Sequence, residues 1–335
     1  MKINWEPITL DLKTTWRIAH GASDQRYNVV IQLEEGLGEA AGVPHHGESQ
    51  EGIIAYLEAV TDQVTDLEDP SLIEDILNGL PPGSQSSRAG IDLALHDLWG
   101  KRLNQPLYRL LGLDPKGAPQ TCYTIGIDTP EEMARKAVAS GWPILKIKLG
   151  SPGDLDRVVA IRQASPARLR VDANAGWNRE QAMDLIPRLT ELGVELVEQP
   201  LPVDDLEGLR MLRNKKFGVP ILADEPVKTA RDVARHAGAV DGVVIKLQKT
   251  GGIREALRAI HTARALDMLI MLGCMVETSL GVTAAAHLAP LCDYVDLDGP
   301  LLIRNDPFEG LHYNGPHLEL PAGPGLGVSY RTESS

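Results

Sequence analysis

The chain has 335 residues, 43% hydrophobic and 24% charged, which is typical of a folded protein large enough for a barrel or two domains. Its net charge of −13 and its lack of a basic run argue against a nucleic-acid or anionic membrane partner. Small molecules are therefore the expected partners. The three cysteines form no C-x-x-C pair, so neither zinc nor a disulfide framework is indicated.

We expect a cytoplasmic protein. The first residues lack the apolar core of a signal peptide, and the longest apolar run, Met268 to Val276, is too short to span a membrane. The cysteine usage fits a reducing compartment. A homo-oligomer is also expected.

Residues 1–117 predict an α+β capping domain. Strand-like pieces at 2–13 and 28–42 have Gly-rich breaks that suit an antiparallel meander. Apolar residues at helical spacing predict helices over 48–64 and 86–103. The Pro- and Gly-rich tail 316–335 is predicted to pack back on this domain.

Residues 118–315 alternate short apolar runs with helical stretches. Eight runs end in polar residues at intervals of 22 to 27 residues, as expected for consecutive βα units. Eight such units close into a parallel barrel. The predicted fold is therefore an α/β, (β/α)8-type barrel, modified as (β/α)7β. The predicted strands are 120–125, 144–149, 168–173, 194–199, 220–225, 242–247, 269–274 and 293–298.

Three consecutive strands end in carboxylates: Asp172, Glu198 and Asp224. A single Asp after a strand is more often a helix cap or turn residue. Three neighbouring strand ends, however, lie about 5 Å apart and can direct their side chains to one point. Carboxylate oxygens without His or Cys suit Mg²⁺ first and Mn²⁺ second. Such an ion would stabilise an enediolate formed when a substrate carboxylate loses its α-proton.

Two lysines alternate with aliphatic residues in the run "LKIKLG". Lys146 and Lys148 point to the same side of a strand, which we predict to be the barrel interior. A free lysine, with a pKa of about 10.4, is a weak base near neutrality, and a neighbouring cation lowers that value. Lys148 is therefore the predicted base, with Lys146 or the metal as its helper.

Lys246 ends the sixth strand, on the wall opposite the second strand. Two lysines flanking one carbon can remove a proton from one face and return it to the other, which is racemisation or epimerisation. Alone, Lys246 could equally extend toward solvent. Lys249, in "KTGG", is a rival that we predict to face solvent or lie in a loop, and His45-His46 is predicted to lie in a surface loop.

Several motifs in order resemble the enolase superfamily, in its muconate-lactonizing subgroup, and most closely dipeptide epimerases of the L-Ala-D/L-Glu epimerase type. They are "LKIKLG", "LRVDANAGW", "ELVEQP", "ILADEP", "VVIKLQKTGG" and "LGCMVETSLG". The resemblance implies one Mg²⁺ on the carboxylates and Lys148 and Lys246 as acid/base pair. It favours Lys246 over Lys249.

The segment "VDLDGP" resembles the D-x-D motif by which dipeptide epimerases bind the substrate's α-ammonium, with Asp296 and Asp298 as its carboxylates. Thr124 and Met275 are further predicted substrate contacts. The resemblance implies epimerisation at the α-carbon of the dipeptide's C-terminal residue. N-acylamino acid racemases, o-succinylbenzoate synthases and muconate-type cycloisomerases share the lysines and metal site and remain alternatives. A catalytically silent binding protein is a further one.

One position departs from relatives specific for Ala-Glu. Matching "WRIAHGASDQR" to their substrate loop places Gly21 where they carry an arginine that binds the glutamate carboxylate. Arg17 and Arg26 lie nearby and could substitute, and Asp24 could favour a cationic side chain. We predict that the second residue is not Glu and is neutral or hydrophobic.

Overall fold

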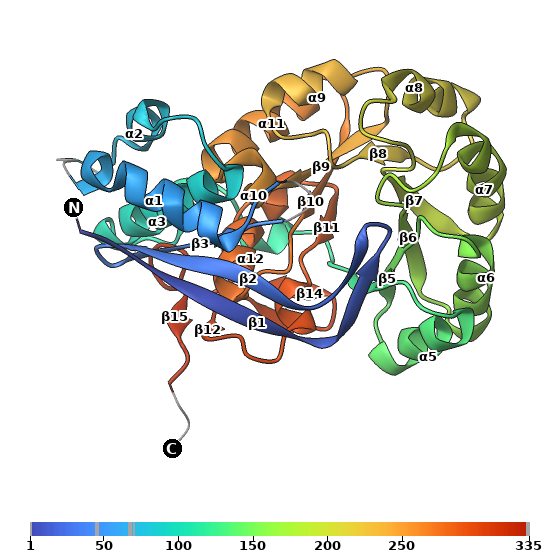
Figure 1. Cartoon of the computed structure of the whole chain (residues 1–335), viewed down its shortest axis with the longest axis horizontal. Helices are drawn as coiled ribbons and strands as arrows, with labels where there is room; N and C mark the ends of the chain where they lie inside the picture. Colours follow the sequence, from blue (N-terminus) through green and yellow to red (C-terminus); the bar gives the residue numbers. More distant parts are fainter. Residues whose placement is uncertain (1, 44–46, 66–68, 70, 333–335) are drawn as a thin grey trace.

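The computed structural model describes residues 2–43, 47–65, 69 and 71–332 (Figure 1). His45-His46 lies outside the described residues. An antiparallel sheet with helices forms one part of the molecule, and a ring of parallel strands surrounded by helices forms the other. This arrangement confirms the predicted fold class.

The N-terminal sheet is a meander of three strands in the order β1-β2-β3. The predicted piece at 28–42 contains the end of one strand and all of the next, because the chain turns at Glu34 with a φ of 53°. Helix α3 packs on this sheet, and Ser84 begins it by accepting a hydrogen bond from the Ser87 amide. The elements are β1 (Ile3–Ile18), β2 (Gly21–Leu33), β3 (Gly36–Ala41), α1 (Gln50–Thr65), α2 (Ile73–Gly79), α3 (Gln85–Arg102) and α4 (Leu107–Leu110).

The barrel sheet has eight parallel strands in sequence order from β4 to β11. A parallel bridge between Thr121 and Val295 joins its first and last strands. The strands are β4 (Tyr123–Ile125), β5 (Ile144–Lys148), β6 (Arg168–Asp172), β7 (Val194–Glu198), β8 (Ile221–Ala223), β9 (Gly242–Lys246), β10 (Leu269–Gly273) and β11 (Tyr294–Asp296).

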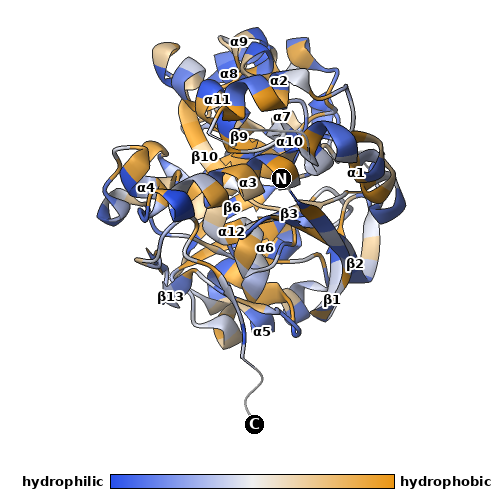
Figure 2. Ribbon diagram, turned by 90° about the vertical axis from the view of Figure 1, so that its left-hand side faces the viewer, coloured by the Kyte–Doolittle hydropathy of each residue, from blue (hydrophilic) through white to orange (hydrophobic). Residues whose placement is uncertain are grey.

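Helices follow the first seven barrel strands, and a short 3₁₀ turn, η4 (Gly299–Leu302), follows the eighth. This is the predicted (β/α)7β form. In Figure 2 strands β9 and β10 are mostly hydrophobic, whereas the surrounding helices show both colours. The helices are α5 (Pro130–Ser140), α6 (Asp154–Ala164), α7 (Arg179–Glu191), α8 (Leu206–Lys215), α9 (Ala230–His236), α10 (Leu247–Thr250), α11 (Ile253–Ala265) and α12 (Ser279–Ala286).

The chain after η4 returns to helix α3 of the N-terminal region. Leu326 is buried, and its amide donates to Asp97 of α3 over 2.7 Å. The short strands here are β12 (Phe308–Glu309), β13 (His312–Asn314), β14 (His317–Glu319) and β15 (Ser329–Tyr330). Two more 3₁₀ turns are η2 (Pro115–Gly117) and η3 (Ala289–Leu291).

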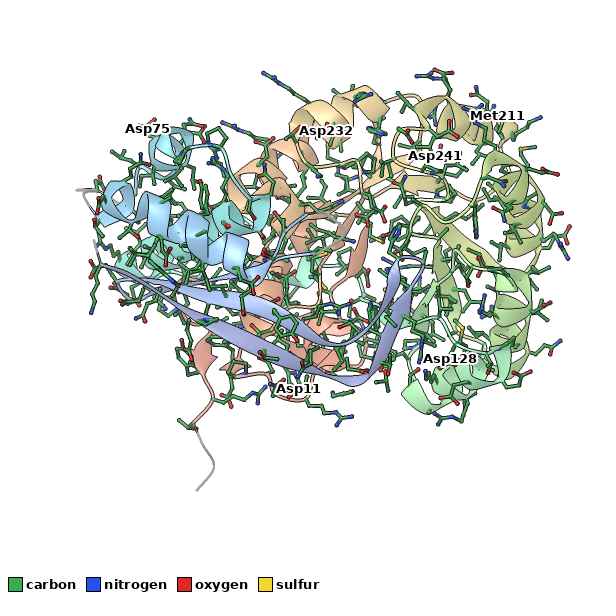
Figure 3. All side chains as sticks on the ribbon, viewed as in Figure 1. Asp11, Asp75, Asp128, Met211, Asp232 and Asp241 are labelled. Carbon is green, nitrogen blue, oxygen red and sulfur yellow. The ribbon has the colours of Figure 1, made fainter. Side chains whose placement is uncertain are left out.

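Asp75 on α2 is exposed, and Asp232 on α9 is partly exposed (Figure 3). Among the described residues, no helix combines the length and apolarity needed to cross a membrane. The β1–β2 hairpin extends from the N-terminal sheet to the barrel, where the Ile127 amide donates to Arg17 O over 2.9 Å. The hairpin thus reaches the end of the barrel at which the strand-end residues lie.

Candidate active site

Strand β5 brings the two lysines of "LKIKLG" into the barrel. All five of its residues are buried, and Leu145 and Ile147 belong to the hydrophobic core between strands and helices. Lys146 and Lys148 therefore point the other way, because side chains alternate along a strand. Both lysines line a cavity at the carboxyl ends of the barrel strands, here called the main cavity.

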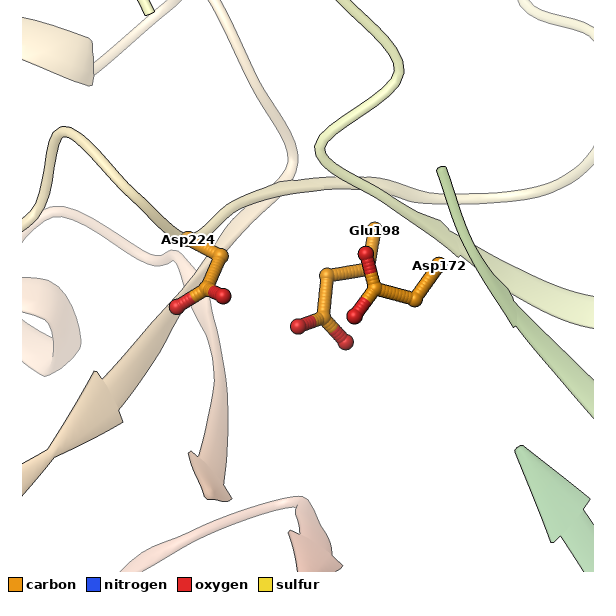
Figure 4. A group of neighbouring side chains, drawn as sticks. All are labelled: Asp172, Glu198 and Asp224. Atoms are coloured by element: carbon orange, nitrogen blue, oxygen red, sulfur yellow. The ribbon is translucent and has the colours of Figure 1, made fainter. Parts of the chain in front are cut away.

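The three predicted carboxylates converge. Asp172 and Glu198 end β6 and β7 and are paired in register, and Asp224 follows β8. One oxygen from each lies within 4.8 Å of the others, and Figure 4 shows the Glu198 carboxylate between the other two. All three side chains are buried.

Glu198 carries the clearest sign of a missing partner. Neither of its buried carboxylate oxygens accepts a hydrogen bond from the described part of the chain, although Lys146 Nζ lies 2.7 Å from Oε2 outside hydrogen-bond geometry. Leaving a buried carboxylate without hydrogen bonds is costly. Three converging oxygens, one of them on a carboxylate that accepts no hydrogen bond from the described residues, fit a hard divalent cation.

The pKa values of these carboxyls are shifted in different directions. Burial raises the pKa of Glu198 well above its ordinary value, and the charge of Asp172 adds to the rise. Burial acts the same way on Asp224, but Lys246 and Lys249 outweigh it and hold its pKa well below the usual range. The site is therefore electrostatically uneven before any cation binds.

Lys148 and Lys246 approach the carboxylates from different walls. Lys148 Nζ lies 2.6 Å from Asp172 Oδ2, and Lys246 Nζ lies 2.7 Å from Asp224 Oδ2. Their strands, β5 and β9, are separated by three strands of the eight-stranded sheet. Both lysines line the main cavity, so a small molecule in it would lie between two ammonium groups.

Lys146 lies deeper and has more anionic neighbours. Its Nζ is 2.7 Å from Asp296 Oδ2 and 3.2 Å from Asp172 Oδ2, in addition to its contact with Glu198. Burial alone would lower the pKa of Lys146, but Asp296, Glu198 and Asp172 together raise it well above its ordinary value. Lys146 is therefore a fixed positive charge in the middle of the site.

The prediction for Lys249 was wrong. Its side chain is buried, and Nζ lies 2.5 Å from Asp224 Oδ1 and also donates to the Asp224 carbonyl oxygen. The cause is α10, a single helical turn directly after Lys246 that directs Lys249 back under Asp224. Spacing alone placed this lysine in a turn and missed its role as a partner of Asp224.

The two aspartates after β11 have different surroundings. Asp296 is paired with Lys146, and its Oδ1 accepts from the Cys122 thiol over 3.2 Å. Asp298 Oδ2 accepts from the Thr124 amide over 2.6 Å, and burial together with the charge of Asp296 raises the pKa of Asp298 to about 7. Both aspartates line the main cavity.

The other predicted substrate contacts lie in two different places. Thr124 and Met275 line the main cavity, whereas Gly21 is exposed and lines a neighbouring pocket. Arg26 lines both spaces and donates to the carbonyl oxygen of Gln25 over 2.9 Å. Arg17 is instead 4.0 Å from Asp128.

The N-terminal region supplies cavity residues that the sequence patterns do not predict. Trp16 and Ile18 of β1 and Asn28 of β2 line the main cavity. The alternation of Trp16 and Ile18 could have placed both on one face of a strand, but which surface that face meets depends on domain docking. Asn174 and Glu225 also line it, and the Asn174 Nδ2 donates to Glu225 Oε1 over 3.3 Å.

Two family models match this chain. Residues 129–334 match the one described as enolase C-terminal domain-like, and residues 7–112 match the N-terminal domain of mandelate racemase / muconate lactonizing enzyme. The chain therefore belongs to the mandelate racemase / muconate lactonizing enzyme family of the enolase superfamily. It is an isomerase of the racemase and epimerase kind.

Among its relatives, the L-Ala-D/L-Glu epimerase of Bacteroides thetaiotaomicron is 38% identical over 98% of this chain and 88% of its own length. The dipeptide epimerase of Enterococcus faecalis V583, solved with Mg and L-Leu-L-Tyr, matches with a TM-score of 0.93 and 34% identity, covering 98% of this chain and 99% of that one. The N-succinyl Arg/Lys racemase of Bacillus cereus matches with a TM-score of 0.91 and 30% identity, covering 99% and 96%.

Proposed function

We propose that this protein epimerises a dipeptide at the α-carbon of its C-terminal residue by 1,1-proton transfer between two lysines. The observation that carries the proposal is the pair Lys148 and Lys246, buried on different walls of one cavity beside three converging carboxylates. The dipeptide epimerases among its relatives support the substrate class.

Asp172, Glu198 and Asp224 would hold one Mg²⁺, with Mn²⁺ as a possible replacement, and the fit rests on the unpartnered oxygens of Glu198. When bound, the cation supplies charge stabilisation to the substrate carboxylate as its α-proton leaves. The Mg-containing relative supports this choice of metal.

Proton transfer belongs to the lysines. For one epimer, neutral Lys148 removes the α-proton from one face and protonated Lys246 returns a proton to the other face. For the opposite epimer, the two lysines exchange these roles. The substrate passes through an enediolate between the two steps. Lys146, surrounded by carboxylates, supplies fixed positive charge beside the reacting lysine.

Asp296 and Asp298 would bind the α-ammonium of the dipeptide. Asp296 is already neutralised by Lys146, whereas Asp298 accepts from Thr124 and forms no ion pair with the described lysines, so we expect Asp298 to contribute more to this recognition. The runner-up is an N-acylamino acid racemase, favoured by the similarity to an N-succinyl amino acid racemase. N-acylated substrates lack a free α-ammonium group, which makes Asp298 the discriminating residue.

We also propose that the second residue of the dipeptide is neutral or hydrophobic and not Glu. Gly21 provides no side-chain cation, and the lining of the main cavity includes the apolar side chains of Trp16, Ile18, Val276 and Leu302. Arg26 is the hairpin cation that reaches this cavity. Turnover of L-Ala-L-Glu at the same rate as L-Ala-L-Leu would contradict this part of the proposal.

A dipeptide library incubated in deuterium oxide with Mg²⁺ tests the function. Mass spectrometry should detect one deuterium at the C-terminal α-carbon, and chelation of the metal should abolish its uptake. Asp298→Asn should weaken the turnover of free dipeptides by about a hundredfold while leaving any N-acylated substrate unaffected. If only N-acylated compounds exchange, the runner-up is correct, and if nothing exchanges, the silent binding protein gains support.

Three further expectations stay predictions. They are the domain division at 1–117 and 118–315 with the tail 316–335 on the first domain, a homo-oligomeric state, and a cytoplasmic location. Size-exclusion chromatography with light scattering tests the second of these.

A further inference from the structure

A second buried polar cluster lies where the N-terminal sheet meets the barrel. It consists of Asn28, Glu39, Gln248, Glu277 and Thr278, and we call it the seam cluster. All five side chains are buried. They come from β2, β3, α10 and the loop between β10 and α12, so the cluster joins elements that are far apart in the sequence.

Glu39 is the centre of the seam cluster. Its carboxylate accepts from Asn28 Nδ2 over 2.7 Å, from Thr278 Oγ1 over 2.6 Å and from the Gly281 amide over 3.0 Å. The Thr278 amide donates as well, over 3.1 Å. A carboxylate from the N-terminal sheet therefore caps the first turn of barrel helix α12, where the helix dipole favours negative charge.

Gln248 and Glu277 extend the cluster on both sides. Gln248 Nε2 donates to the Glu39 carbonyl oxygen over 3.0 Å and to Glu277 Oε2 over 2.8 Å, and its Oε1 accepts from the Ala41 amide over 3.0 Å. Glu277 Oε1 accepts from the Met275 amide over 2.8 Å. Asn28 Nδ2 also donates to the Val276 carbonyl oxygen over 3.1 Å.

These bonds hold a wall of the main cavity. Met275 and Val276 line that cavity, and the loop that carries them is fixed at Met275 N, Val276 O and Thr278. The packing is close, because a Cβ at Gly281 would lie 2.3 Å from Glu277 Oε2 and 2.9 Å from Glu39 Oε2. Glu39 itself does not line the cavity.

We propose that Glu39 is a positioning residue of the active site, which holds the Met275–Val276 wall in place from the N-terminal sheet. An uncharged, buried tie would suffice to join two domains, whereas a buried carboxylate is costly unless its donors are fixed. Its donors belong to the loop and to the first turn of α12, so the hydrogen bonds that Glu39 accepts set the position of the loop. The proposal concerns a substrate-facing wall and to that extent rests on the proposed function.

Glu39→Gln is the primary test because it keeps the size of the side chain and turns an acceptor into an amide donor. The Gln amide group would face Thr278 Oγ1 and the backbone amides of Thr278 and Gly281, which cannot all be satisfied. We expect faster hydrogen exchange at residues 275–281 and a KM for the best dipeptide raised about tenfold. Both kcat and the Mg²⁺ affinity should stay within about threefold, because Glu39 contacts none of the strand-end groups.

Two controls separate positioning from general destabilisation. Glu35→Gln changes an exposed carboxylate in the same β2–β3 hairpin and should alter neither exchange nor KM. Thr278→Val removes one donor to Glu39 and should reproduce part of the effect, and Thr278→Ser should restore wild-type behaviour.

Unchanged exchange at 275–281 in a folded Glu39→Gln would overturn the proposal, and so would a loss confined to kcat or to Mg²⁺ affinity. Hydrogen exchange needs no substrate. A wild-type protein that epimerises no dipeptide would therefore refute the proposed function while leaving the positioning of the loop testable.

Discussion

The strand-end cluster, which comprises Lys148, Asp172, Glu198, Asp224 and Lys246 with their neighbours, and the seam cluster both contain buried carboxylates. The two clusters differ in how far those carboxylates are hydrogen-bonded. In the seam cluster the carboxylates of Glu39 and Glu277 accept hydrogen bonds from amides and hydroxyls. At the strand ends, buried oxygens of Glu198, Asn174 and Glu225 have no hydrogen-bond partner. Among the described residues, half of the buried side-chain polar atoms without a hydrogen-bond partner belong to these three strand-end residues, and none belongs to the seam cluster.

The difference in hydrogen bonding matches a difference in role: the strand-end cluster is proposed to carry out the reaction, and the seam cluster to hold the cavity wall in place. Strand-end groups must exchange partners when a cation and a substrate arrive, so they combine lysines and carboxylates with incomplete hydrogen bonding. The side chains of the seam cluster need to keep only one set of hydrogen bonds. Variants should therefore affect turnover and metal binding in the first cluster, and loop order and substrate affinity in the second.

The largest effect is expected from the two lysines. Lys148→Ala and Lys246→Ala should each lower the rate of epimerisation by about a thousandfold or more, because one face of the α-carbon loses its acid/base group. Each variant should still exchange the α-proton of one epimer, and the two variants should prefer opposite epimers. Proton NMR in deuterium oxide measures this, with Lys215→Met as an exposed lysine control. Equal exchange of both epimers by either variant would contradict the two-lysine mechanism.

Glu198→Gln should have opposite effects on function and stability. Removal of its charge should weaken Mg²⁺ binding at least tenfold, because one of three converging carboxylates is lost. In the presence of a chelator the same variant should be more stable by roughly 1 to 3 kcal/mol, because the burial cost of a carboxylate that accepts no hydrogen bond is removed while Lys146 keeps Asp172 and Asp296 as partners.

Isothermal titration calorimetry and urea unfolding measure the two effects. Glu191→Gln, an exposed carboxylate at the end of α7, should change neither. A destabilised Glu198→Gln would mean that this carboxylate is already satisfied without a cation.

Lys249→Met tests whether Lys249, which was wrongly predicted to face solvent or lie in a loop, supports metal binding by Asp224. Without Lys249, Asp224 loses the contacts that fix its Oδ1 and its carbonyl oxygen, so its carboxylate is held less firmly toward Asp172 and Glu198. We expect about tenfold weaker Mg²⁺ binding, the size of effect seen when a residue behind a metal ligand is removed. Calorimetry measures it, with Lys215→Met again as control. Unchanged affinity would leave Lys249 a purely structural cation.

The strand-end cluster could be predicted because it follows a local rhythm. Each βα unit delivers one residue to the same rim, so the positions of Lys148, Asp172 and Lys246 are encoded within single units. The seam cluster has no such signal. Glu39 and Gln248 are 209 residues apart and meet only when the sheet docks on the barrel. The prediction for Lys249 was wrong for a related reason, because one turn of helix after Lys246 points the Lys249 side chain back toward Asp224.

The smallest expected effect concerns pH and the seam cluster. Burial, reinforced by the charge of Glu39, raises the pKa of Glu277 to about 8, with Lys246 as the charged group that opposes the rise. A carboxyl whose pKa is raised on folding binds more protons in the folded state, so its contribution to stability is complete below its unfolded pKa of about 4.5 and declines as pH rises through about 8.

Glu277→Gln removes this titration. The free energy of unfolding of the wild type, relative to that of Glu277→Gln, should therefore fall between pH 6 and pH 9, by an amount on the order of 1 kcal/mol or more. Urea unfolding of both proteins across this range measures the difference, in which titrating groups remote from Glu277 cancel. Parallel curves would mean that Glu277 is ionised throughout. The seam would then hold two buried carboxylates on hydrogen bonds alone, and the contrast with the strand ends would become one of geometry and not of charge.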